Sequence, residues 1–534
     1  MSLPYMLNAS NIRQYGQGGF GGYNHNLYAG DGEIYDMKNM TSDLAPLLAP
    51  RRPRYIYKTL SAPNGLYAND GLYWVDGTGF YAAGVQRGTV SNSRKMFASL
   101  GAYIVIMPDK AYYNKLTGEF GSLEASWSGS ATIQDGTYAG EDAEANTIYA
   151  AGADWDSKFR EGDAITIAGA TAHPGNNVTI IIREIDGDYL RFYPNSFTIG
   201  EGGDSETLTI SRDMPDMDFI TSNENRLWGC KGDEIYGSKL GDPFNWNVFD
   251  GLSTDSYAVS VGSAGDFTAA YSYLGYPIFF KEEQIYKIYG DRPANYQVMS
   301  SASLGVEAGS HMSLAIAGET LYYLSRAGVV AYSGGIPQSI AAALGTDRYS
   351  DAVAGSDGLK YYVSMLGEDG RRLFVYDTQR GMWHAEDDTD AVGWAWDSEL
   401  YCLDADGTLW INGNARNVPE GCTMEGAVQS EVIFGDFVDD NPNKKGTAKF
   451  LIRDEIDEGG TIDLYVEFDS DGEWREMVDG HITAEDKRSH TLAVVPRRSD
   501  HYRIKIMGSG SWRVYALTRE DYIGSSLKSL PGRQ

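Results

Sequence analysis

The chain has 534 residues, with 44 Lys and Arg against 74 Asp and Glu, and its formal net charge is −30. Such a surface repels nucleic acid, because proteins bind it largely by neutralising phosphates with Lys and Arg. It still allows passive contact with DNA, and an alternative interpretation is that the charge serves solubility alone. Hydrophobic residues make up 42%, which indicates a globular chain, and the length suits two or three domains.

Residues 1–60 are expected to form an extended N-terminal arm, because the stretch 16–23 is too rich in glycine for a helix. The first nine residues lack the basic start and apolar centre of a signal peptide, and no run approaches about 18 apolar residues. We therefore expect synthesis in the cytoplasm and no membrane span.

Within the arm, three prolines bracket a basic cluster of Arg51, Arg52 and Arg54. Two interpretations are open. The cluster is either a solvated turn or internal salt-bridge group, or it contacts an acidic neighbour such as another copy of this chain.

Short hydrophobic hairpins with Gly- and Asp-containing turns recur through residues 61–123 and 213–418. In the clearest stretch, Leu314–Trp410, the anchoring residues Tyr322, Tyr362 and Tyr401 lie 40 and 39 residues apart. A period of about 40–45 residues is typical of propeller blades. The sequence thus predicts an all-β fold with a β-propeller of six to eight blades, in which terminal strands are available to close the ring. The hairpins begin at Leu72, Tyr103, Arg226, Pro277, Leu321, Leu359 and Leu400.

Two regions depart from this rhythm. Residues 124–212 have Gly/Ala/Asp-rich connections around short strands such as Ala164–Ile167, and we expect an inserted β-barrel or sandwich there. Residues 419–524 contain strands that alternate at period two, such as Ile462–Phe468, and are expected to form a C-terminal β-sandwich. Residues 525–534 complete the chain as a short polar tail.

Motifs that carry chemistry are not found. The sequence has no Gly-rich phosphate loop, His-Glu-x-x-His, Gly-x-Ser-x-Gly or Cys-x-x-Cys. Cysteines are odd in number and lack metal spacing, so a disulfide framework is not expected. We predict no catalytic, cofactor-binding or metal-binding residues and no cofactor. The cysteines are Cys230, Cys402 and Cys422, and the scattered histidines are His25, His173, His311, His384, His481, His490 and His501.

The best enzyme candidate is the acidic stretch Glu386–Asp388, which follows Trp383 and His384. Propellers can be glycosidases with carboxylates around the central mouth, but no pair can be placed at catalytic separation from sequence. The alternative interpretation is a solvated connection between blades.

Two acidic turns, Asp404–Gly407 and Asp469–Gly472, resemble the start of a calcium loop. An EF-hand needs a Glu at a fixed distance beyond the Gly, between two helices. Trp410 and the next strand occupy that space in the first turn, and Glu473 comes too soon in the second. Asp and Gly also favour hairpin turns, so we expect turns here, with calcium binding left open.

Several segments resemble structural proteins of tailed phages. The glycine-rich residues 19–24 are followed by Asp31-Gly32-Glu33 and Asp36-Met37-Lys38-Asn39-Met40. Residues 322–335 and 496–503 also resemble segments of these phage proteins. The family that these segments suggest is that of the tail nozzle, or packaged-DNA-stabilisation, proteins of short-tailed phages. Residues 124–212 have no counterpart that we can match to it.

This resemblance implies six copies in a ring below the adaptor, in contact with neighbouring tail or adaptor proteins. It also implies a lumen that retains packaged DNA, passes it during ejection and touches it transiently and without sequence preference. The expected location is the virion tail.

Two main hypotheses follow. The first is a non-enzymatic structural subunit of a phage tail. The second is a carbohydrate-binding or glycan-hydrolysing propeller at the tail tip, based on 11 Trp and 37 Tyr whose rings could stack on sugars. The periodic placement of these aromatics argues that most of them belong to the core. A third, weaker hypothesis is an assembly scaffold that is absent from the mature particle.

Overall fold

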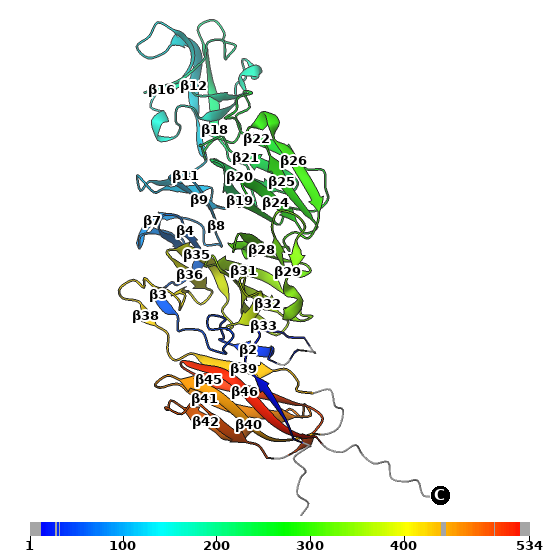
Figure 1. Cartoon of the computed structure of the whole chain (residues 1–534). Helices are drawn as coiled ribbons and strands as arrows, with labels where there is room; N and C mark the ends of the chain where they lie inside the picture. The colour runs from blue at the N-terminus through cyan, green and yellow to red at the C-terminus, as the bar shows by residue number, and fades with distance from the viewer. Residues whose placement is uncertain (1–11, 27–28, 31, 439–444, 496, 524–534) are drawn as a thin grey trace, which may run out of the picture. The chain divides into compact units, whose positions relative to one another are not determined.

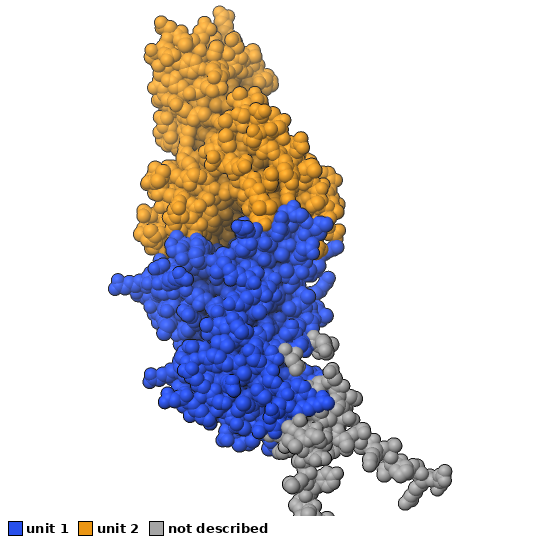
Figure 2. Space-filling model, in the orientation of Figure 1, with its two compact units in different colours: residues 1–61, 312–534 blue, residues 62–311 orange. Residues whose placement is uncertain are grey.

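The computed structural model describes residues 12–26, 29–30, 32–438, 445–495 and 497–523. The predicted tail, residues 1–11 of the predicted arm, and Asp31 and Pro496 of the phage-like segments lie outside these ranges. Strands joined by turns dominate the described chain (Figure 1). Two compact units are formed, one by residues 1–61 with 312–534 and the other by residues 62–311 (Figure 2).

Seven antiparallel sheets within the described ranges are the blades of a β-propeller. This confirms the all-β class, and the number of blades falls within the predicted six to eight. Four blades belong to the unit of residues 62–311. Their strands are β4 Pro63–Ala68, β5 Leu72–Asp76, β6 Gly79–Ala82 and β7 Val85–Thr89; β8 Met96–Leu100, β9 Tyr103–Met107, β10 Ala111–Asn114 and β11 Phe120–Ser122; β19 Phe219–Asn223, β20 Arg226–Lys231, β21 Glu234–Gly237 and β22 Tyr257–Ser260; β23 Ala269–Tyr273, β24 Tyr276–Lys281, β25 Gln284–Tyr289 and β26 Gln297–Ala302.

Three blades belong to the other unit. Their strands are β27 Ala315–Ala317, β28 Thr320–Ser325, β29 Gly328–Tyr332 and β30 Gln338–Ser339; β31 Ser350–Ser356, β32 Lys360–Gly367, β33 Gly370–Asp377 and β34 Met382–Ala385; β35 Ala391–Asp397, β36 Glu399–Asp404, β37 Thr408–Ile411, β3 Tyr55–Thr59 and β38 Thr423–Met424. Single turns of 3-10 helix lie between strands at Trp155–Ser157, Pro174–Asn176, Pro293–Asn295, His311–Ser313 and Ala341–Leu344.

Each predicted hairpin forms the two central strands of a blade. Tyr322, Tyr362 and Tyr401 lie on β28, β32 and β36, and each is no more than 6% exposed. Burying such large rings against neighbouring strands favours blade packing.

A strand from the arm completes the last blade. β3 pairs antiparallel with β37, with Tyr55 opposite Ile411 and Thr59 opposite Thr408. The Tyr57 ring meets the Tyr401 ring edge to face at a centroid distance of 5.6 Å. This is the closure by a terminal strand that the sequence analysis anticipated.

Residues 125–212 form one seven-stranded sheet around their own core. The long strand β12 lies at its centre, paired with β18 on one side and β13 on the other. Trp155, Phe159 and Phe192 are almost fully buried in this core. In sheet order the strands are β15 Thr179–Ile181, β14 Ala164–Ala168, β18 Asp204–Arg212, β12 Ala125–Thr137, β13 Glu144–Tyr149, β17 Tyr189–Phe192 and β16 Glu184–Asp186.

The C-terminal region, with β1 and β2 of the arm, forms a curled ten-stranded sheet whose buried residues belong to one core. On β41 the residues Ile462, Leu464 and Val466 are buried while those between them are partly exposed, as the period-two pattern predicted. The strands in order are β1 Ile12–Gln17, β46 Trp512–Ile523, β40 Lys445–Ile456, β43 His490–Ala493, β42 Arg475–Thr483, β41 Thr461–Phe468, β45 Tyr502–Ser509, β39 Gln429–Phe434 and β2 Ile34–Lys38, with β44 Arg498–Ser499 beside β40.

The described part of the arm is built into these sheets. β1 pairs with β46 and β2 pairs with β39, so the arm supplies both edges of the C-terminal sheet. Between them, Tyr23 N donates to Trp383 O at 2.6 Å, next to the strand β34 of a blade. The arm therefore ties blade residues and the C-terminal sheet together within one unit. No helix in the described ranges has the length and apolar character needed to cross a bilayer.

Candidate functional site: a buried network of arginines and carboxylates

The two sequence segments with the most suggestive charge meet each other in the structure. Arg54 Nη2 lies 2.5 Å from Glu386 Oε2, and Arg54 Nη1 lies 3.0 Å from Asp387 Oδ2. Arg51 Nη2 is 3.3 Å from the same Asp387 oxygen, and Arg51 Nη1 is 2.7 Å from Glu425 Oε2. Arg51 and Arg54 of the predicted basic cluster and Glu386 and Asp387 of the predicted acidic stretch thus form one ion-pair network with Glu425.

The backbone of the arm positions Arg51 for these contacts. Asn39 has φ of 55°, a left-handed conformation that Asn tolerates better than most residues. Its Oδ1 accepts from Arg51 Nε at 2.8 Å, and its Nδ2 donates to Gln429 O at 2.7 Å. Asn39 belongs to the phage-like segment 36–40, so this segment has a structural part in the network.

Opposite charges and hydrogen bonds shift the pKa values of Asp387, Glu425 and Arg54. Burial alone would raise the pKa of Asp387, but Arg54, the Thr389 hydroxyl and Arg51 together lower it to about 2. The pKa of Glu425 is also lowered, because hydrogen bonds from Arg51 and from Arg54 N outweigh its burial. Asp387 and Glu386 raise the pKa of Arg54 despite its burial.

Asp387 is not poised to act as a general acid. A general acid needs a pKa near the working pH, and Asp387 is far below that range. The cavity beside Arg54, Glu386 and Tyr362 is about 10 Å³, room for about one water molecule. The basic cluster was interpreted either as an internal salt-bridge group or as a contact with an acidic neighbour. For Arg51 and Arg54 the geometry favours the internal salt-bridge group. Glu386 and Asp387 are buried partners, and neither is a solvated connection.

Arg52 differs from its two neighbours. It is exposed, and its side chain has no ion pair with any described residue. Together with Pro50, Pro53 and Trp512 it lines a cleft of about 530 Å³. Within the basic cluster, Arg52 alone is therefore available to an acidic neighbour.

The first acidic turn is held by hydrogen-bond donors of the protein. Asp404 Oδ1 accepts from Thr408 N at 2.7 Å, and its Oδ2 accepts from Trp410 Nε1 at 2.7 Å. Both oxygens stabilise the β36–β37 turn, which agrees with the expectation of a hairpin.

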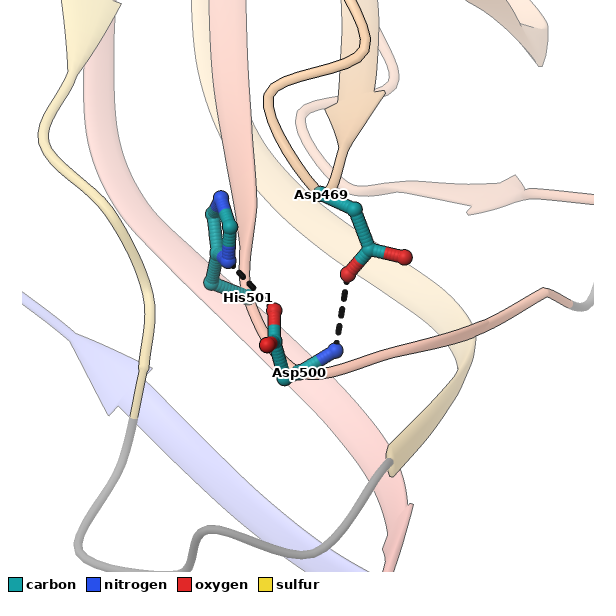
Figure 3. Close-up of side chains that lie close together, drawn as sticks. All are labelled: Asp469, Asp500 and His501. Carbon is teal, nitrogen blue, oxygen red and sulfur yellow. Dashed lines mark hydrogen bonds and ion pairs between the residues drawn. The ribbon is translucent and has the colours of Figure 1, made fainter.

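The second acidic turn joins a small cluster that sequence reasoning did not assemble (Figure 3). One atom each of Asp469, Asp500 and His501 lie within 4.8 Å of one another, an arrangement that could hold a cation. However, His501 Nδ1 lies 2.5 Å from Asp500 Oδ1, and its Nε2 lies 2.8 Å from Ser470 Oγ. Asp469 Oδ1 accepts from Asp500 N at 2.9 Å.

These contacts join the three side chains by hydrogen bonds within the protein. The hydrogen bond from His501 lowers the pKa of Asp500, as expected for a carboxylate paired with an imidazole. The neighbouring Asp471 is held by Arg475 and Arg497 at 2.8 Å each. The turn is thus cross-linked to the start of β45.

Among the other histidines, His25 Nδ1 lies 2.9 Å from Tyr35 O, and the His311 ring lies against Phe219 at a centroid distance of 5.2 Å. His173, His481 and His490 each face a carboxylate, at 3.6, 2.6 and 3.6 Å. His384 is different, because it is buried and its Nδ1 has no hydrogen-bond partner among the described residues. Burial and the nearby charge of Lys360 lower its pKa to about 3.

All three cysteines are free thiols, with Cys230 and Cys402 buried and Cys422 partly exposed. This agrees with the expectation that no disulfide framework exists.

Comparison with known proteins gives little further guidance. No protein-family model matches the sequence, and no curated protein matches it. Among solved structures, one similar chain is PorZ, a bacterial surface component of the type-IX secretion system of Porphyromonas gingivalis. It is 12% identical with a TM-score of 0.25, and the match covers 86% of this chain and 71% of PorZ. Another is a bifunctional GH43-CE protein of Bacteroides eggerthii, 8% identical with a TM-score of 0.20, covering 59% and 63%. Neither similarity is close enough to bear on function.

The main omission at sequence level is Glu425. It lies 374 residues from Arg51 in sequence, in the polar region between the last blade and the C-terminal sheet. No local pattern distinguishes it from the other carboxylates of this acidic chain. The one available signal was the unbalanced positive charge of the Arg cluster, which requires a partner if it is buried.

Proposed function

We propose that this protein is a non-enzymatic structural subunit of a phage tail. It assembles with copies of itself, six in the nozzle-like arrangement, into a ring below the adaptor. The ring lines or gates a channel that retains packaged DNA. Its location is the virion tail, and its partners are its own copies and the neighbouring tail or adaptor proteins.

The observation that carries this proposal is the structural use of the segments that resemble phage tail proteins. Tyr23 N donates to Trp383 O, and Asn39 Oδ1 accepts from Arg51 Nε in the buried network. A Cβ on Gly22 would lie 2.4 Å from Trp383 O, so the close approach of the two backbones requires glycine there. Tyr23, Gly22 and Asn39 of these segments thus have structural parts in the described chain.

The charge of the chain is compatible with a channel for DNA. At a formal net charge of −30, a wall contributed by this protein repels phosphate and does not trap it. DNA would touch such a wall only briefly and without sequence preference.

Arg52 gives the proposed ring a candidate contact. It is an exposed, unpaired cation beside a cleft, in a protein whose copies are strongly acidic. An acidic loop of the neighbouring copy would be attracted to this cleft.

Electron microscopy of the purified protein and of virions tests the proposal. We expect closed rings with a central hole from the recombinant chain, and the protein among the components of purified virions by mass spectrometry. A protein that stays monomeric at high concentration and is absent from virions would refute the proposal.

A further inference from the structure

A cleft of about 290 Å³ lies between the inserted sheet and the long β21–β22 loop, inside the unit of residues 62–311. One wall is formed by β15 and the residues around Tyr193, and the other by residues 247–250. The volume is close to the lower end of small-molecule sites, which span about 300–1,000 Å³. The cleft is separate from the buried ion-pair network.

The walls of this cleft are fixed to each other by buried polar contacts. Asn245 Oδ1 accepts from Ala164 N at 2.7 Å, and Asn245 Nδ2 lies 3.3 Å from Asp163 Oδ1. Asp163 is also ion-paired with the buried Arg212. Since Asn245 and Asp163 are each 2% exposed, the loop is firmly attached to the inserted sheet.

The loop is braced on its blade side as well. Trp246 is buried and its Nε1 donates to Pro243 O at 3.0 Å, while Val248 N donates to Ser256 Oγ at 3.2 Å. The residues between these anchors, Asn247 and Phe249, are exposed at the cleft. The cleft is therefore largely formed before any ligand arrives, which lowers the entropic cost of binding.

Two aromatic rings border the cleft without belonging to any core. Tyr193 is 55% exposed and Phe249 is 60% exposed. The guanidinium of Arg183 lies 3.9 Å from the centre of the Tyr193 ring and covers one of its faces. This contact fixes the orientation of the ring and leaves the remaining surface for a ligand.

Polar side chains of both signs converge on the same space. Arg183, Asn247 and Asp250 all line the cleft and are exposed. Among the described residues, none of the three side chains has a hydrogen-bond or ion-pair partner, apart from the stacking of Arg183. Their donors and acceptors are thus free, and they include a carboxylate, an amide and a planar cation.

We propose that this cleft binds a saccharide. A sugar ring presents C–H groups on its faces and hydroxyl groups at its edge. The faces suit the rings of Tyr193 and Phe249, and the hydroxyls, which both donate and accept, suit Asp250, Asn247 and Arg183. A cleft of this volume takes one or two sugar rings.

Other ligands fit the cleft less well. A purely apolar ligand would leave Arg183 and Asp250 unsatisfied when it displaced their water. A nucleic acid would meet the carboxylate of Asp250 in a strongly acidic protein. The proposal is independent of ring formation, because the cleft is complete within one chain.

An array of immobilised mono- to tetrasaccharides, probed with the full-length chain, tests this proposal. Calorimetric titration with the saccharide that binds then gives the affinity of each variant. We expect Tyr193→Ala, Phe249→Ala and Asp250→Ala each to weaken binding about tenfold or more. Tyr193→Phe keeps the ring and is expected to retain most of the affinity.

The matched control is Trp396→Ala, because Trp396 is an exposed aromatic outside the cleft, at 52% exposure. We expect it to bind as the unaltered chain does. Since the altered side chains are exposed, their thermal unfolding is expected to stay the same, which separates lost binding from misfolding. An array without binding, a saccharide that binds all three cleft variants equally well, or binding to a peptide array alone would overturn the proposal.

Discussion

Arg54 Nη2 and Glu386 Oε2 lie 2.5 Å apart although 332 residues separate them in sequence. Arg54 of the arm is thereby ion-paired with the loop that follows β34. The basic cluster suggested a partner and the acidic stretch suggested catalysis, and the charges of these two residues neutralise each other. The pair is buried, with side-chain exposures of 11% and 10%. The pair matters for the stability of the fold, because either ion without the other would be a buried charge with no counter-ion.

Replacing Arg54 by Met is expected to destabilise the unit of residues 1–61 and 312–534 by about 3–5 kcal/mol, because it leaves buried carboxylates without a counter-charge. Glu386→Gln is expected to act in the same direction, and the double variant to cost less than the sum. Urea unfolding followed by tryptophan fluorescence gives these values. The control is the exposed neighbour, since Arg52→Ala is expected to change stability by no more than about 0.5 kcal/mol. Equal losses from Arg52 and Arg54 would contradict this account.

Acid is expected to unfold the same unit through His384. Its folded pKa of about 3 lies below the ordinary value of 6.5, so the folded state binds fewer protons than the unfolded state. Stability is therefore full above about pH 6.5 and falls by about 1.4 kcal/mol per pH unit below it, until the folded histidine titrates. Asp387, with its pKa lowered to about 2, adds a loss that begins below about pH 4.

The variant His384→Phe removes the first of these contributions. Its urea midpoint is expected to vary less between about pH 6 and 4 than that of the unaltered chain, while the loss at lower pH persists. An unchanged slope in that interval would show that other groups cause the acid sensitivity.

The sequence revealed the centre of each blade but not its outer strands. Central strands such as β28 and β36 bury nearly every residue, so they appear as apolar runs. The outermost strands β26 and β30 are almost wholly exposed and follow the rest of the blade through backbone hydrogen bonds. The side chains of these outer strands show no apolar pattern, so the sequence predicts only the central hairpin of each blade.

The sites were harder to predict than the fold, because they join distant segments. The network brings Arg51 to Glu425, and the proposed saccharide cleft brings Tyr193 to Phe249. An exposed aromatic and a buried one look alike in a tyrosine-rich sequence. Only the arrangement of the inserted sheet against the β21–β22 loop distinguishes Tyr193 from the core aromatics.

Asp404 is expected to stabilise its turn without calcium. Asp404→Ala removes the acceptors of Thr408 N and Trp410 Nε1 and is expected to cost about 1–2 kcal/mol. Asp406→Ala, in the same turn but exposed, is the control and is expected to have little effect. Thermal unfolding in the presence of calcium or of a chelator tests whether calcium contributes to the stability of this turn. A rise in Tm on adding calcium that Asp404→Ala abolishes would instead indicate a calcium site.

The three thiols are expected to react at very different rates. Burial raises the pKa of the Cys230 and Cys402 thiols well above its ordinary value, and both are inaccessible. Cys422 is partly exposed, so a thiol reagent is expected to modify this residue alone in the folded protein. The others become reactive only on unfolding in denaturant. Rapid modification of Cys402 in the native chain would show that its blade opens readily.

Arg52 provides the sharpest test of the proposed ring. Reversing its charge, Arg52→Glu, places a carboxylate where an acidic loop of the next copy is expected to dock, and like charges there oppose assembly. We expect rings to be lost by light scattering and electron microscopy while the unfolding midpoint of the monomer stays the same. Arg52→Lys keeps the charge and is expected to assemble. If Arg52→Glu forms normal rings, the contact between copies lies elsewhere on the subunit.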